Sequence, residues 1–234
     1  MARILKIRLP GGIFLLKFPS QYELAATFLR FQEHAESSRF SGRTFSLEEF
    51  MDWYAGKFGN FTYYQDWAGF NVPSTVLEPF RAGSFDPLLE KERRFLKLFA
   101  RERRPFYVIG VGEAHTRSDL AHEIAHALFF TNQDYRRAVL EAMRGHDTAP
   151  LRRALSRMGY SRAVLTDEVH AYLVAGAEGV TGPAAGRLAA PRRALKSLFA
   201  RHSRALMARA SRELRRRARS RRKANRPVRR KRAR

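Results

Sequence analysis

Two short runs of β-branched and aromatic residues open the chain. They are separated by Pro10-Gly11-Gly12, and glycine adopts positive φ at little cost, as a tight turn requires. The pattern predicts a β-hairpin formed by Arg3 to Leu9 and Ile13 to Phe18.

Helical periodicity follows the predicted hairpin. Serine or aspartate start signals, each followed by apolar residues three and four apart, predict helices from Ser20 to about Phe31, from Ser46 to near Gly59, and from Asp86-Pro87 toward Pro105. Eight aromatic residues lie between positions 53 and 70. Such a cluster usually builds core; alternatively, residues 66–71 form a loop that lines a cleft, with Asn71 as a substrate contact.

Farther along, Phe106 to Val111 is an aromatic and β-branched run that predicts a strand. Thr116 and Asp119 then form a T-x-x-D start signal for a helix whose flanks are apolar on nearly every side. Two early strands, a later strand and many helices predict an α+β domain.

This helix contains an H-E-x-x-H motif, in which His122 and His126 stand at i and i+4 on one face and can reach a single zinc ion. Glu123 turns toward the open side of the ion. There it can take a proton from a water whose pKa the metal has lowered to about 7. Strand, loop and zinc helix follow one another as in a zincin fold. The alternative is a helix that carries these residues by chance.

A catalytic zinc site has three protein ligands and one open position. The metzincin pattern requires Gly at 129 and His at 132, where this chain has Phe129 and Asn132, so that pattern is excluded. The remaining candidates for the third ligand are Glu141, His146, Asp167, Glu168 and His170.

Glu168 is the preferred third ligand. Apolar positions around it predict a second buried helix over residues 164–174, and a buried carboxylate is costly unless a charge such as zinc neutralises it. His146, 20 residues after His126, is the main rival, although its glycine and polar neighbours indicate a solvated loop.

Several neighbours could complete the machinery. Asp167 could accept a hydrogen bond from a ligating histidine, or it could simply cap the helix, as Thr166 could. Donors to the oxyanion that forms during hydrolysis could come from His115, Tyr160, His170 or Tyr172, each of which also has a structural interpretation.

The motif followed by a glutamate on a later helix resembles the gluzincin arrangement of thermolysin-like metallopeptidases. That resemblance implies His122, His126 and Glu168 as ligands and Glu123 as general base. The chain differs at Tyr172, where those enzymes have an aspartate. The chain resembles a group of uncharacterised bacterial proteins more closely. This resemblance spans residues 60–175, implies no substrate and is carried by the segments HEIAHALFFTN, DEVHAYL and DWAGFNVP.

Length and composition are consistent with one catalytic domain and an appendage. The absence of cysteine excludes disulfides and thiolate ligands and fits a cytoplasmic location. No apolar run reaches the length of a membrane span, and charges interrupt the N-terminal segment too often for a signal peptide.

The charge is concentrated at the C-terminus. From residue 191 to 234 there are 20 Lys or Arg and one acid, Glu213. We therefore expect a zincin-like domain over 1–175, a flexible linker over 176–191 and a basic tail over 192–234, helical at first and then disordered. The helical half could pack on the domain, lie on an anionic membrane or follow nucleic acid.

Two functional classes remain. The first is a zinc metallopeptidase acting on a peptide or protein. The second is a nucleic-acid-associated protein, in which the tail binds a polyanion and the metal site is structural. A hybrid would resemble the SprT-like proteases, which act on DNA-bound proteins and use a third histidine, so His146 would replace Glu168. Alternatively, the tail is only a solubilising segment.

Overall fold

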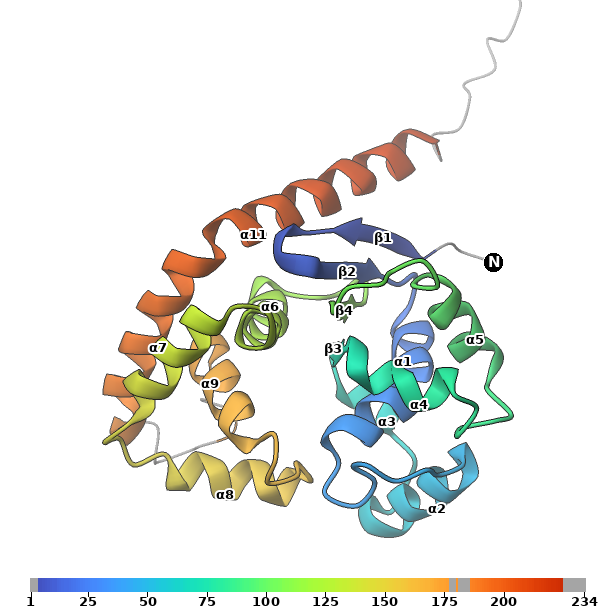
Figure 1. The fold of residues 1–234 in the computed structure, drawn as a ribbon, viewed down its shortest axis with the longest axis horizontal. Helices are drawn as coiled ribbons and strands as arrows, with labels where there is room; N and C mark the ends of the chain where they lie inside the picture. Colours follow the sequence, from blue (N-terminus) through green and yellow to red (C-terminus); the bar gives the residue numbers. More distant parts are fainter. Residues whose placement is uncertain (1–3, 177–179, 181–185, 225–234) are drawn as a thin grey trace, which may run out of the picture.

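The structure is a computed structural model that describes residues 4–176, 180 and 186–224. It is mostly helical, with one small four-stranded sheet near the centre (Figure 1), so the α+β prediction is confirmed.

The sheet contains all three predicted strands and one strand that was not predicted. Its order is β1-β2-β4-β3, in which β2 and β4 are parallel and the other two pairs are antiparallel. The strands are β1 (Leu5–Arg8), β2 (Ile13–Lys17), β3 (Gly69–Pro73) and β4 (Tyr107–Val111). No strand was predicted over β3, and a loop over residues 66–71 was only the alternative interpretation; its pairing with β4 makes it an edge strand.

The predicted helices are present, with three differences at their boundaries. Helix α1 extends five residues past Phe31, α5 begins at Glu90 rather than at Asp86, and α5 ends at Lys97, well before Pro105. The helices are α1 (Gln21–Glu36), α2 (Leu47–Phe58), α3 (Tyr63–Asp66), α4 (Glu78–Arg81), α5 (Glu90–Lys97), α6 (Arg117–Thr131), α7 (Gln133–Met143), α8 (Ala149–Met158), α9 (Leu165–Ala175) and α11 (Ala189–Ala224), with short 3-10 turns at Pro10–Gly12 and Ser74–Leu77.

The sheet separates two hydrophobic cores, because side chains alternate along each strand. On β2, Ile13 and Leu15 enter a core shared with α6, α7, α9 and α11, whereas Phe14 and Leu16 enter an aromatic core shared with α1, α2 and α5. At Gly110 of β4, a Cβ atom would lie 2.5 Å from the Phe28 ring. Glycine at this position therefore lets α1 pack closely on the sheet.

A buried ion pair ties α1 to α5. Arg30 donates two hydrogen bonds to Glu92, at 2.7 and 2.5 Å, and two longer ones to the carbonyl oxygens of Phe45 and Phe85. Both charged side chains are at most 5% exposed. This ion pair explains why a polar residue, Glu92, lies on the otherwise apolar face of α5.

The helix expected in the basic tail is α11. Its first half packs against the domain. Leu195, Phe199, Leu206 and Leu214 are buried in the same core as α6, α7 and α9. In Figure 1, α11 runs along α7 and then past the β1 end of the sheet. The predicted linker over 176–191 lies partly outside the described residues. In the part of the chain that the structure describes, no helix combines the length and apolar character needed to cross a bilayer.

We expect Glu92→Ala to lower the free energy of unfolding by about 3–5 kcal/mol, because Arg30 would remain buried without its counterion. Urea denaturation measures this change. Glu90→Ala, which removes the exposed pair with Arg93, is the matched control and should cost about 0.5 kcal/mol or less. Equal losses in the two variants would contradict a structural role for the buried pair.

Candidate metal centre

Helix α6 carries the H-E-x-x-H motif through the middle of the domain. Its N-terminus is held by reciprocal hydrogen bonds: Thr116 Oγ1 accepts from the Asp119 backbone N–H, and the Asp119 carboxylate accepts from the Thr116 N–H. The helix packs between the sheet and helices α7, α9 and α11. Its position is therefore fixed on nearly all sides, as the apolar flanks predicted.

Three potential metal-binding groups converge between α6 and α9. The Nε2 atoms of His122 and His126 are 3.1 Å apart, and the Glu168 carboxylate lies 3.5 Å from the second and 3.9 Å from the first. Donor atoms bound to one tetrahedral zinc ion at 2.0–2.1 Å stand about 3.3 Å from one another. The three side chains could thus hold a metal ion.

The burial of Glu168 supports the same interpretation. The residue is 2% exposed, and its Oε2 atom is buried without a hydrogen-bond partner among the described residues. Burial raises the pKa of Glu168 to about 8, and the nearby carboxylates of Asp167 and Glu123 add to this rise. A buried carboxylate oxygen with no donor is costly, and a cation at this point would remove the cost.

Asp167 orients two histidines, His126 and His170, from the side away from the potential metal position. Its carboxylate lies 2.9 Å from Nδ1 of His126 and 3.3 Å from Nδ1 of His170. Burial alone would raise the pKa of Asp167, but the two histidines outweigh it and lower the pKa to about 2. The His122 ring makes its own hydrogen bond to the backbone of Ala171. With Nδ1 of His126 engaged, its Nε2 atom is left to face the metal position.

Without a metal, the two histidines have opposite charge preferences. Burial and the neighbouring His126 keep the pKa of His122 well below its usual value. Burial also acts to lower the pKa of His126, but Asp167 and Glu168 outweigh it and raise that pKa well above its usual value. His126 must therefore lose a proton when a metal ion binds.

Glu123 is held beside the three potential ligands by β3. Asn71 donates a hydrogen bond of 2.7 Å to the Glu123 carboxylate and accepts one from the Tyr107 hydroxyl. At Gly69 a Cβ atom would lie 2.5 Å from Glu123 Oε1, so glycine leaves the space that this carboxylate occupies. Burial raises the pKa of Glu123 to about 7. Such a carboxyl group can accept and return a proton near neutral pH.

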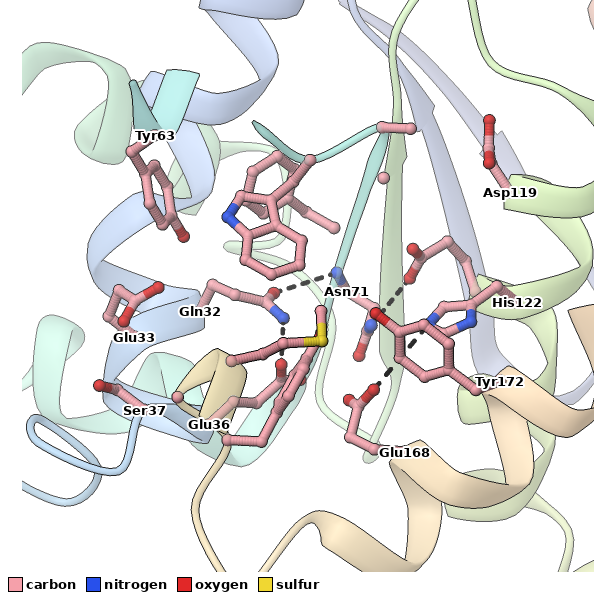
Figure 2. Close-up of a pocket in the computed structure, with 18 of the residues that line it drawn as sticks. Gln32, Glu33, Glu36, Ser37, Tyr63, Asn71, Asp119, His122, Glu168 and Tyr172 are labelled. Carbon is pink, nitrogen blue, oxygen red and sulfur yellow. Dashed lines mark hydrogen bonds and ion pairs between the residues drawn. The ribbon is translucent and has the colours of Figure 1, made fainter. Parts of the chain in front are cut away.

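A cavity of about 290 Å³ opens on this group of side chains. Figure 2 shows His122 and Glu168 on one side and the end of α1 on the other, with Asn71 between them. Tyr160 and Tyr172 also line the cavity, and the Tyr172 ring lies edge-on to His122 with their centres 4.8 Å apart.

The other sequence candidates lie elsewhere. His146 and Glu141 are exposed and outside the group that could hold a metal ion. His170 is fully buried behind that group, where its Nε2 atom lies 2.7 Å from the Tyr135 hydroxyl, and His115 interacts with the Gly112 carbonyl. Asn71, the substrate contact of the alternative loop interpretation, lies on β3, is 4% exposed, lines the cavity and donates a hydrogen bond to Glu123.

Sequence reasoning missed three cavity residues, all on the last turns of α1. Gln32 accepts a hydrogen bond from the Asn71 backbone N–H and donates one to Glu36, and Glu33 lies beside them. The predicted helix stopped at Phe31. The available signal was the helical periodicity of the preceding residues. When that periodicity is continued for one more turn, these polar residues lie just beyond the aromatic core.

Comparisons of this chain with protein-family models, with curated proteins and with solved structures find no match.

Proposed function

We propose that the protein is a zinc-dependent peptidase with a zincin-like domain of the gluzincin type. The observation that carries the proposal is the convergence of His122, His126 and Glu168, with one buried Glu168 oxygen lacking a partner. Two imidazoles and one carboxylate form a typical ligand set for catalytic zinc, and they leave a fourth position for substrate or water.

Zinc bound here would supply the Lewis acid that polarises a peptide carbonyl and makes an adjacent water more acidic. The protein residues perform the remaining tasks. Glu123, held by Asn71, accepts the proton of the attacking water and delivers it to the leaving amine. Asp167 keeps His126 oriented, and the cavity beside them admits the substrate.

Tyr172 is the proposed donor to the oxyanion. It lies one turn after Glu168 on α9 and lines the cavity against His122, whereas His170 faces the opposite side of the helix. Burial raises the pKa of Tyr172 to about 12, so its hydroxyl keeps its proton at neutral pH and can donate a hydrogen bond.

We expect the metal-free protein to bind one Zn²⁺ per chain, and His122→Ala and Glu168→Ala to lose it, as measured by elemental analysis after dialysis. Asp167→Asn should weaken zinc affinity by about 10–100-fold in chelator competition. Because protons must leave His126 and Glu168, affinity should fall as the pH is lowered from 8 to 6. His146→Ala is the matched control; loss of zinc in this variant, with Glu168→Ala unaffected, would overturn the assignment.

We expect Gly69→Ala and Glu123→Gln to abolish peptide cleavage while retaining zinc. The first displaces the Glu123 carboxylate, and the second removes its basicity. Cleavage of a fluorogenic peptide library and zinc content would be measured on the same samples. Gly56→Ala, at a position where an added Cβ meets nothing within 4 Å, controls for the glycine substitution. Full activity in Glu123→Gln would exclude the proposed general base.

Polyanion binding is a second candidate function. The apolar stripe of α11 is buried against the domain, so it is not available to insert into a membrane, while Arg193, Arg204 and Arg212 are exposed along the described part of the helix. This arrangement favours an electrostatic partner such as nucleic acid.

We expect the full chain to bind duplex DNA with little sequence preference and with an affinity that falls steeply as salt increases, in fluorescence anisotropy. A chain ending at Arg216 retains the buried stripe and loses many of the basic residues, so it should fold normally and bind more weakly. Absence of binding at low salt would remove this candidate and leave the peptidase proposal untouched.

A further inference from the structure

The wall of the cavity opposite the histidines has its own chemistry. Glu33 and Glu36, from the last turns of α1, line the cavity across from His122 and Glu168 (Figure 2). Aromatic residues of α2 and α3, including Trp53, Tyr54 and Tyr63, continue this wall. The cavity therefore extends well beyond what binding a metal ion alone would need.

The charge of this wall contrasts with that of the whole chain. The protein has a net charge of +23, yet no lysine or arginine is among the described residues that line the cavity. Lys57 lies behind this wall: its charge acts to lower the pKa of Glu33, and its Nζ atom lies over the Trp53 and Phe58 rings, 5.0 and 4.9 Å from their centres. A zinc ion would offset the charges of Glu123 and Glu168, and Glu33 and Glu36 are two further acidic groups on the opposite wall.

One polar group of this wall lacks a partner: Glu36 accepts a hydrogen bond from Gln32, but the buried Tyr63 hydroxyl has no hydrogen-bond partner among the described residues. Burial raises the pKa of Glu33 to about 7, and burial together with Glu168 raises the pKa of Glu36. The Tyr63 hydroxyl belongs to a residue that is 1% exposed; it lies close enough to Glu33 to counter part of this rise but does not reach hydrogen-bond geometry. A ligand with hydrogen-bond donors and a positive charge would stabilise all three groups.

We propose that Glu33 and Glu36, with the aromatic residues beside them, form a recognition pocket for the cationic side chain of a lysine or arginine in a peptide substrate. The carboxylates accept its hydrogen bonds, and the rings of Trp53 and Tyr54 stack against its planar or methylene portion. A volume of about 290 Å³ is at the small end of ligand pockets and suits one side chain.

This proposal concerns the substrate of the peptidase proposed above, and it can be tested without catalysis. The probes are N-acetyl-arginine amide, N-acetyl-lysine amide, N-acetyl-leucine amide and N-acetyl-citrulline amide, the last of which has the shape of arginine without its charge. Binding to the metal-free and zinc-loaded full chain is measured by NMR chemical-shift titration. We expect the two cationic probes to bind at least about 10-fold more tightly than citrulline, which corresponds to about 1.4 kcal/mol.

Variants then locate the pocket. Glu33→Gln and Glu36→Gln should each weaken binding of the arginine probe by about 10-fold and leave binding of the citrulline probe unchanged. Glu48→Gln, on the exposed first turn of α2, is the matched control and should have no effect. Glu33 and Glu36 are only partly buried, and an isosteric amide preserves the packing of either side chain, so unfolding would not explain a loss of binding. Thermal melting of each variant checks this directly.

Equal binding of arginine and citrulline, tighter binding of N-acetyl-leucine amide, or unchanged arginine binding in both glutamine variants would overturn the proposal. Failure of zinc to bind, or of Glu123→Gln to affect cleavage, would instead contradict the proposed peptidase function. Because the probe titrations are also performed on metal-free protein, the two failures are distinguishable.

Discussion

The structure depends on the contact between two adjacent carboxylates at the start of α9 and two histidines one turn apart on α6. Ionised carboxylates are costly to bury: His126 stabilises the charge of Asp167, whereas burial raises the pKa of Glu168 to about 8 even though His126 faces it. Both acids also occupy the first turn of their helix, where the helix dipole favours negative charge. The apolar residues around them hold α6 and α9 together, so packing and charge act on the same interface.

The sheet contributes the remaining part of the site. Strand β3 places Asn71 against Glu123 and leaves the space at Gly69 that the same carboxylate fills. Gln32 extends this network from the edge of the sheet to Glu36 on α1. The general base proposed here is thus supported from the side opposite to the two histidines. A substitution in the aromatic core that moved α1 would therefore also move Glu123, because Gln32 and Asn71 connect the two by hydrogen bonds.

The features predictable from sequence were those determined by local spacing or by the cost of burying charge. Thr116 and Asp119 identified the start of α6, and the expense of burying Glu168 singled it out before its partners were known. The roles of Gly69 and Asn71 could not be predicted, because β3 exists only through pairing with β4, more than thirty residues away in sequence. For α11 the apolar spacing predicted a helix, but it left open whether that helix packs on the domain, lies on a membrane or follows nucleic acid; the tertiary contacts of its buried residues select the first.

The structure also separates the charges of the chain by location. Basic residues dominate α11 and the segment that follows it, whereas the cavity is lined by carboxylates and lacks described lysines and arginines. A polyanion on the outer surface and a cationic group in the cavity would therefore not compete for the same place. The two kinds of ligand could be present on one molecule at the same time.

The packing of α11 has a consequence for the order of events during synthesis. Helices α6, α7 and α9 are translated before the buried residues that cover them, Leu195, Phe199, Leu206 and Leu214. Until residue 214 has emerged, these helices present an uncovered apolar surface, of the kind that chaperones bind and that promotes aggregation. A ribosome that stalls just after α9 would therefore release a chain that has every side chain of the candidate metal centre but lacks the helix that holds α6 and α9 in place.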